Sequence, residues 1–254
     1  MKLVRAAIMA FALYSRIPMP RVDWESDSRR LTLYAFPLVG LAVGGAMVLW
    51  WHICYVFSLH SILWAVGLTA LPLIVTGGIH MDGYCDVWDA RSSHGSREKK
   101  LDILKDPHIG AFGVLHCVLY LLVTAALWEQ TAAGPVPALP LLAIPVASRA
   151  LSACGALFLP NARGSGLLAQ VTGWRGGRFG LLALALVCLL GLGWLNPAYL
   201  CVAFGAALAC GDTLRVCLRE FGGTTGDLNG WFLQRCELAC LAGLVLARWL
   251  EGLG

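Results

Sequence analysis

Charged residues are scarce in this 254-residue chain. Asp, Glu, Lys and Arg together make up 13% of it, whereas soluble globular domains carry about 25%. Hydrophobic residues make up 58%, and the mean hydropathy is +0.71. The scarcity of charge excludes a soluble globular domain, so the sequence predicts an all-α, polytopic membrane protein.

The sequence also lacks the patterns of several other classes of protein. It has no CxxC pair, which disfavours zinc and iron–sulfur sites. It has no basic stripe with interleaved aromatic residues, so nucleic acid is not an expected partner. Eight of its ten cysteines lie inside apolar runs, where they are predicted to pack rather than form disulfides. No internal repeat is visible, so residues 1–254 are predicted to form a single domain.

Apolar runs long enough to cross a bilayer, which takes about 20 residues, occur seven times. They cover residues 34–57, 61–79, 112–133, 137–158, 179–195, 197–218 and 230–250. Glycines at 40, 44 and 45 offer a small-residue surface for close helix packing. The chain also begins with a basic and apolar stretch over residues 2–14, which is too short to span and lacks a small-x-small cleavage site after it. We expect an interfacial or re-entrant helix there.

Basic residues are absent from every second connection between the predicted spans. Residues 58–60, 134–137 and 196–197 contain no Lys or Arg, whereas the N-terminal segment and the other connections carry most of them. By the positive-inside rule, the N-terminus and the basic connections face the cytoplasm. The longest of them, about 80–111, also holds six of the fifteen acidic residues, so the candidate active-site loop is expected to be cytoplasmic.

Three aspartates follow directly on the second apolar run. Asp82, Asp86 and Asp89 have the i, i+4, i+7 spacing that places side chains on one face of a helix. Three like charges at close range repel unless a cation neutralises them. Mg²⁺ takes oxygen ligands, keeps several waters and bridges carboxylates to phosphates. The sequence therefore predicts a Mg²⁺ site at this membrane boundary, although acids that only solvate a loop are the simpler alternative.

Two further segments allow both a structural and a functional interpretation. Residues 97–110 fit a short amphipathic helix on the membrane surface, yet Lys105 is placed to neutralise phosphate and Asp102 and Asp106 to supply more oxygens. Residues 222–230 form either a helix-connecting turn or a phosphate-cradling turn with Asp227 as a ligand or base.

Arg149 and Asp212 are two of the charges that fall inside predicted spans. Intramembrane charge is a functional hypothesis by default, so Arg149 and Asp212 are expected either to bind substrate anions or to pair with one another. Gly77 and Gly78, just before His80, would let a substrate approach the backbone closely.

Five motifs in order resemble the cobalamin-5′-phosphate synthase family, also called adenosylcobinamide-GDP ribazoletransferase. They are Ser15-Arg-Ile-Pro-Met-Pro20, Phe36-Pro-Leu-Val-Gly40, Gly77-Gly-Ile-His-Met-Asp82-Gly with Asp86 and Asp89, Leu101-Asp-Ile-Leu-Lys-Asp106 with Ile109-Gly110, and Gly223-Thr-Thr-Gly-Asp227. The chain departs from the family pattern at Ala90 (usually Gly), at Asp102 (usually Glu) and at Pro107-His108 (usually Ser-Arg).

The resemblance implies a Mg²⁺-dependent enzyme of the bacterial inner membrane. In the implied reaction, the ribose 3′-hydroxyl of α-ribazole, or of its 5′-phosphate, attacks the pyrophosphate of adenosylcobinamide-GDP. GMP leaves, and adenosylcobalamin or its 5′-phosphate forms. The partners are thus these two substrates and the lipid bilayer, with a homo-oligomer left open.

The residues are assigned to this reaction as hypotheses. The predicted metal ligands are Asp82, Asp86, Asp89, Asp106 and Asp227. Lys105 and Arg149 are predicted to contact phosphates, and Asp106 or Asp102 to accept the hydroxyl proton. Asp82, Asp102, Lys105 and Asp106 form the predicted catalytic set. Substrate contacts are predicted at Arg16, His80, Arg149, Thr225 and Gly226.

Two alternatives belong to other classes of membrane protein. A CDP-alcohol phosphotransferase also binds metal through aspartates on membrane helices, but its DGxxAR pattern is not met, because Asp82-Gly83 is followed by Tyr-Cys-Asp. An ion-coupled transporter would place its acids near the bilayer midplane, whereas these acids gather at one aqueous face.

Overall fold

The structure is a computed structural model that describes residues 2–24, 26–132, 138–164, 166–172 and 176–252. Its elements are α1 (Lys2–Tyr14), α2 (Ser26–Arg29), α3 (Thr32–Val56), α4 (Ser61–Thr76), α5 (Ile79–Ser92), α6 (Arg97–Ile103), α7 (Ala111–Gln130), α8 (Ala138–Phe158), α9 (Leu167–Val171), α10 (Arg178–Leu195), η1 (Pro197–Tyr199), α11 (Leu200–Val216), η2 (Cys217–Phe221) and α12 (Gly226–Glu251). The described part contains helices and one isolated β-bridge, which confirms the predicted all-α class.

Six helical segments are long and apolar enough to cross a membrane: α3, α7, α8, α10, α12 and the continuous stretch Pro197–Phe221. The pair α4 and α5 becomes a seventh if its two bent halves are counted as one span. Each of the seven predicted runs thus coincides with a helix. The predicted connection at 134–137, and the run ends that touch it, lie outside the described residues.

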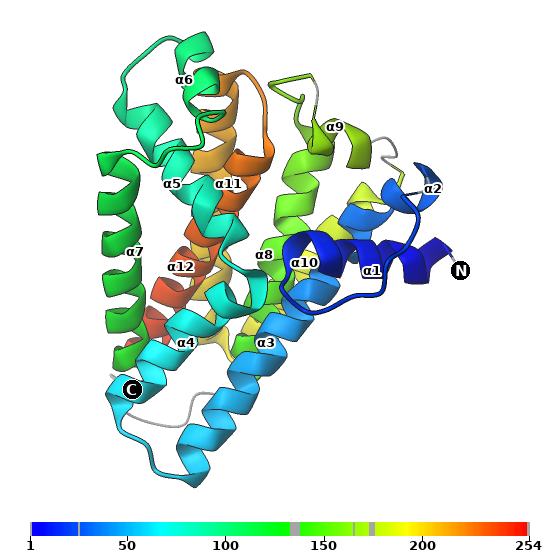
Figure 1. The fold of residues 1–254 in the computed structure, drawn as a ribbon. Helices are drawn as coiled ribbons and strands as arrows, with labels where there is room; N and C mark the ends of the chain where they lie inside the picture. Colours follow the sequence, from blue (N-terminus) through cyan, green and yellow to red (C-terminus); the bar gives the residue numbers. More distant parts are fainter. Residues whose placement is uncertain (1, 25, 133–137, 165, 173–175, 253–254) are drawn as a thin grey trace.

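The long helices run side by side, and α1 lies across α3 (Figure 1). Gly40 and Gly44 bring α3 close to α8, because a Cβ added at Gly44 would come within 2.7 Å of the Leu141 carbonyl oxygen. A Cβ added at Gly40 would clash in the same way with the carbonyl oxygen of Pro145. The predicted small-residue surface therefore exists at Gly40 and Gly44. Gly45 instead faces open space, since an added Cβ meets nothing within 4 Å.

Two consecutive glycines turn the chain sharply between α4 and α5, whose axes differ by 96°. Gly77 (φ 68°) caps the end of α4, and Gly78 (φ 78°) caps the start of α5. A residue with a Cβ rarely adopts this left-handed conformation. Arg16 lies over the bend, because its backbone N–H donates to the Val75 carbonyl (2.8 Å) and its side chain occupies the space where Gly77 would carry a Cβ. The bend aims α5 and its aspartates away from the apolar helix α4.

The connection 80–111 is therefore helical over most of its length rather than an open loop. Helix α5 packs against α12 and α7, and α6 follows it at the same end of the bundle (Figure 1). Glu220 holds this arrangement together. Its carboxylate accepts hydrogen bonds from Arg91 on α5 (3.0 Å) and from Lys100 on α6 (2.7 Å). The site thus lies on an ordered scaffold of packed helices.

Candidate functional site

Helix α5 carries the predicted row of aspartates against the first turns of α12. A Cβ added at Gly83 would come within 2.8 Å of Cα and of the carbonyl oxygen of Asp227. A Cβ added at Gly230 on α12 would come within 3.1 Å of the backbone of His80, which lies one turn before Gly83 on α5. These glycines let the two helices touch, so Asp227 joins the aspartates of α5 although it follows them by well over a hundred residues.

The carboxylates of this group differ in their surroundings. Asp82 is exposed in the first turn of α5, where negative charge complements the helix dipole. Asp86 is half-buried. Burial, followed by repulsion from Asp82, Asp227 and Asp89, raises the pKa of Asp86 to about 7. Four carboxylates therefore act on one another here, and the predicted acidic cluster is a feature of the fold. We call Asp82, Asp86, Asp89 and Asp227 the acidic cluster.

Asp89 has a structural partner that the sequence did not indicate. Its Oδ2 accepts a hydrogen bond from the backbone N–H of Gly110 (2.7 Å), and its Oδ1 accepts one from Gly113 (2.8 Å). These N–H groups belong to the start of α7, which has no side-chain cap of its own. Asp89 thus caps α7 from a neighbouring helix, and a place in a metal site remains a prediction for it.

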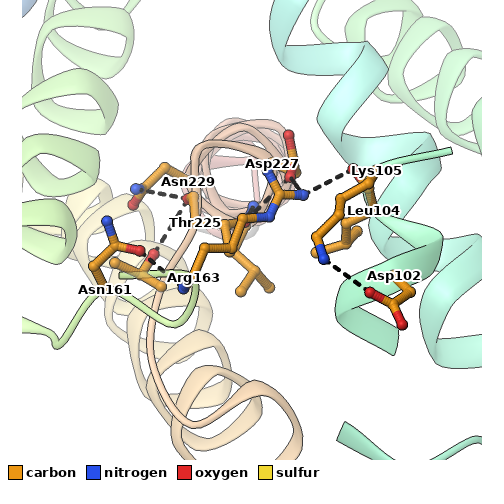
Figure 2. Close-up of polar contacts among 10 residues, drawn as sticks. Asp102, Leu104, Lys105, Asn161, Arg163, Thr225, Asp227 and Asn229 are labelled. Atoms are coloured by element: carbon orange, nitrogen blue, oxygen red, sulfur yellow. Dashed lines mark hydrogen bonds and ion pairs between the residues drawn. The ribbon is translucent and has the colours of Figure 1, made fainter. Parts of the chain in front are cut away.

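Arg163 was not among the predicted site residues, yet it contacts the acidic cluster directly. One of its terminal nitrogens, Nη2, donates to Asp227 Oδ2 (2.8 Å) and to the carbonyl oxygen of Leu104 (2.8 Å), as Figure 2 shows. Asn161 Oδ1 holds the turn by accepting from the backbone N–H of Arg163 (2.9 Å). The buried Nε of Arg163 has no hydrogen-bond partner. Arg163 therefore links α12 to the end of α6 and keeps one donor unused.

The turn at 222–225 is tied into the fold rather than open. The Thr225 hydroxyl accepts from the Leu228 N–H (3.2 Å) as the cap of α12, and it donates to Asp227 Oδ2 (3.3 Å). The Thr224 N–H donates to the Pro160 carbonyl (2.8 Å). Thr225 thus holds Asp227 in place, and a substrate contact through its buried side chain stays a prediction. Gly226 is exposed, with open space where a Cβ would be.

The end of α6 and the residues just after it carry three predicted catalytic residues, Asp102, Lys105 and Asp106, and all three are exposed. Lys105 Nζ pairs with Asp102 (2.8 Å), as Figure 2 shows. Asp106 accepts from the backbone and ring of His108, which lowers the pKa of its carboxyl group. No contact recorded within the described part of the chain joins these side chains to the acidic cluster. This part of the chain reaches the cluster through its backbone, at the Leu104 carbonyl through Arg163 and at the Gly110 N–H through Asp89.

The predicted pairing of Arg149 with Asp212 is wrong. Arg149 is fully buried and donates to Glu237 (2.6 Å) on α12, whereas Asp212 pairs with Arg235. Both partners, Glu237 and Arg235, lie on α12, which packs against the helices that carry Arg149 and Asp212. Local sequence does not show this proximity. Arg149 is part of a buried hydrogen-bond network. Its Nη1 donates to Glu237, to the Ser148 hydroxyl and to the Pro145 carbonyl. A phosphate contact through Arg149 stays an untested prediction.

The donor set of the acidic cluster suits a hard divalent cation. Within the described residues no three His, Cys, Asp or Glu side chains form a ready-made cage. Mg²⁺ does not need one, because it usually binds through one or two carboxylates, waters and substrate phosphates. Burial and then repulsion from the neighbouring carboxylates raise the pKa of Asp86, and a bound cation would relieve the repulsion.

The fold and the site together define an all-α, multi-span membrane protein with an acidic cluster at one end of its helix bundle. The chain belongs to the cobalamin-5-phosphate synthase family, whose model matches residues 6–245. This confirms the family resemblance seen in the sequence.

The chain is similar to three curated proteins named adenosylcobinamide-GDP ribazoletransferase. The one from Lachnoclostridium phytofermentans is 36% identical over 252 residues, covering 97% of this chain and 95% of the relative. The one from Desulfitobacterium hafniense is 34% identical over 250 residues, with 94% and 96% covered. The one from Leptothrix cholodnii is 33% identical over 272 residues, with 97% of each covered. No solved structure gives a significant match.

Proposed function

We propose that this chain is an adenosylcobinamide-GDP ribazoletransferase. It joins α-ribazole, or its 5′-phosphate, to adenosylcobinamide-GDP and releases GMP. Family membership over nearly the whole chain supports the reaction. The observation that carries the assignment of the site is the contact of Gly83 with Asp227, because it gathers acidic residues of α5 and α12 in one place.

In the proposed reaction a ribose hydroxyl oxygen bonds to the phosphorus on the cobinamide side of the diphosphate. The anhydride P–O bond breaks, GMP leaves with the electron pair, and the hydroxyl proton passes to a base. Breaking a phosphoanhydride depends mainly on positioning and on neutralising negative charge. The acidic cluster alone would repel a diphosphate, so the proposal includes a cation.

The proposed ligands of Mg²⁺ are Asp82, Asp86 and Asp227, with Asp89 and Asp106 as the further predicted members. When bound, Mg²⁺ supplies positive charge next to the phosphate oxygens. Arg163 lies at the same cluster with an unused Nε, and Arg16 is exposed at the bend before α5. We assign phosphate contacts to these two arginines, together with Lys105. The proton acceptor is proposed to be Asp102 or Asp106, and the hydrogen bonds from His108 lower the pKa of Asp106, which weakens that carboxylate as a base.

The protein is proposed to lie in the bacterial inner membrane with the acidic cluster on the cytoplasmic side. The basic residues support this orientation, because Arg91 on α5 and Lys100 on α6 both pair with Glu220, and Arg163 contacts the Leu104 carbonyl at the end of α6. Water-soluble nucleotides would then reach the site from the cytoplasm.

The test is to incubate membranes containing the protein with adenosylcobinamide-GDP, α-ribazole and Mg²⁺. The proposal predicts GMP release and a cobamide product, both lost without α-ribazole and both lost when a chelator is added. GMP release that does not depend on α-ribazole, or no release at all, would overturn the assignment. A CDP-alcohol in place of adenosylcobinamide-GDP serves as the control and should give no CMP.

A further inference from the structure

A cavity lies directly beside the acidic cluster. It is formed where α1, α3, α5 and α8 meet the start of α12, and it holds about 50 Å³ of space inside an open-sided hollow. Gly226 and Asn229, which flank Asp227, line the cavity, and so does His80, two residues before Asp82. A group bound there would lie next to the proposed reaction centre.

The walls of the cavity are aromatic and uncharged. The ring of His80 stacks on that of Tyr14, with centroids 6.2 Å apart, and it meets Phe36 at 5.6 Å. Within the described residues the lining contains no Asp, Glu, Lys or Arg. The cavity is therefore unsuited to phosphate or metal and suited to a flat, neutral ring. Gly226, where an added Cβ meets nothing within 4 Å, leaves room on the side of α12.

His80 supplies an unused polar atom. Its side chain is 6% exposed, and its Nε2 is buried without a hydrogen-bond partner. Leaving such a group unpaired typically costs about 1–3 kcal/mol, so buried polar atoms nearly always find a partner. A ring nitrogen, amide or hydroxyl of a ligand would pair with Nε2. Two glycine-mediated contacts fix this position, because α5 cannot move away from α12 without separating Gly83 from Asp227 and His80 from Gly230.

We propose that this cavity binds the heteroaromatic base of a nucleoside substrate, with His80 as its hydrogen-bond partner. The proposal rests on the proposed function, which requires two substrates that each carry such a base. One is the base of α-ribazole and the other is the guanine of adenosylcobinamide-GDP. Both share the chemistry that the cavity offers, namely a flat ring with polar edge atoms.

Steady-state kinetics with each substrate varied in turn tests the proposal. His80→Gln and Phe36→Leu should raise the KM for one of the two substrates about tenfold, the effect of losing one hydrogen bond or ring contact of about 1.4 kcal/mol. The kcat should change less than about twofold, because neither residue touches the reacting atoms. His52→Gln, an exposed histidine near the other end of α3, is the matched control and should change neither constant. The substrate whose KM rises identifies the base that is bound.

Equilibrium dialysis of α-ribazole and of GMP against the purified protein measures the binding of each ligand without requiring turnover. The wild type should bind one of them, and His80→Gln should bind it about tenfold more weakly. Unchanged binding and unchanged KM values for both substrates would overturn the proposal and leave the cavity to water. If His80→Gln does not fold, the Phe36→Leu data decide in the same way. If the wild type binds a nucleoside through this cavity yet releases no GMP, the proposed function has failed and the binding site stands.

Discussion

Arg163 and Asp227 form an ion pair of 2.8 Å between the turn after α8 and the first turn of α12. The same Nη2 of Arg163 also donates to the Leu104 carbonyl, so one guanidinium joins three segments of the site. Both side chains are about one-quarter exposed, which leaves the pair open to competition from a bound phosphate or cation. Arg163 thus positions Asp227, in addition to the phosphate contact proposed for it.

Replacing Arg163 with Lys keeps the charge but removes the fork that reaches two acceptors at once. We expect kcat/KM for GMP release to fall by roughly 10–100-fold, as charged hydrogen bonds typically contribute about 1.5–3 kcal/mol. We also expect the Mg²⁺ concentration for half-maximal activity to rise, because Asp227 is no longer held. Arg219→Lys, an exposed arginine near the same end of the bundle, is the control. Wild-type kinetics in Arg163→Lys would contradict this role.

Gly83→Ala tests the contact between α5 and α12. The new Cβ would meet the backbone of Asp227 at 2.8 Å, so the helices must separate and the acidic cluster must widen. We expect at least a tenfold loss of activity and a lower Tm in detergent, because overpacking costs about 1–3 kcal/mol. Gly45→Ala is the matched control. It adds the same methyl group to a helix in open space and should leave Tm equal or slightly higher.

The raised pKa of Asp86 predicts how stability varies with pH when no metal is bound. In the folded protein Asp86 holds its proton up to about pH 7, whereas in the unfolded chain it ionises near its ordinary value. The folded state therefore binds more protons between these values, and stability falls as pH rises toward 7. With chelator present at pH 8, Asp86→Asn should unfold at a higher temperature than the wild type. The measurement is the Tm of both proteins at pH 5 and at pH 8. If the Tm of Asp86→Asn differs from that of the wild type by the same amount at both pH values, the prediction is wrong.

The buried pair of Arg149 and Glu237 predicts a large effect on stability. Glu237→Gln leaves the Arg149 guanidinium charged and fully buried without its partner. Removing one partner of a buried ion pair costs about 3–5 kcal/mol, so we expect a markedly lower Tm. Asp212→Asn, in the more exposed pair with Arg235, should lower Tm much less, because exposed pairs contribute about 0–1 kcal/mol. Similar losses in both variants would show that Arg149 does not depend on Glu237.

The sequence predicted those features that depend on local composition. Seven apolar runs became helices with ends within a few residues of the prediction, and Asp82, Asp86 and Asp89 lie on one helix because their spacing matches its period. Gly77 and Gly78 were interpreted as a place for a substrate to approach, whereas the fold uses them for a bend. Their positive φ angles are visible only in three dimensions.

Features that depend on long-range contacts were not predicted. Arg163 lies 64 residues from Asp227 along the chain, and Arg149 lies 88 residues from Glu237. No local pattern links either pair. One usable signal was overlooked, since Arg235 and Glu237 are charges within the last apolar run, and such charges call for partners on a neighbouring helix.

We infer that the acidic cluster binds a divalent cation, and a Mn²⁺ titration of the purified protein followed by electron paramagnetic resonance measures this binding. We expect bound Mn²⁺ in the wild type, displaced by excess Mg²⁺, and little or none in Asp82→Asn. The same variant should retain its fold and lose GMP release by at least about 100-fold. Asp212→Asn, whose carboxylate pairs with Arg235 outside the cluster, should bind like the wild type. Equal Mn²⁺ binding in all three proteins, or none in any, would show that the acidic cluster is not a cation site.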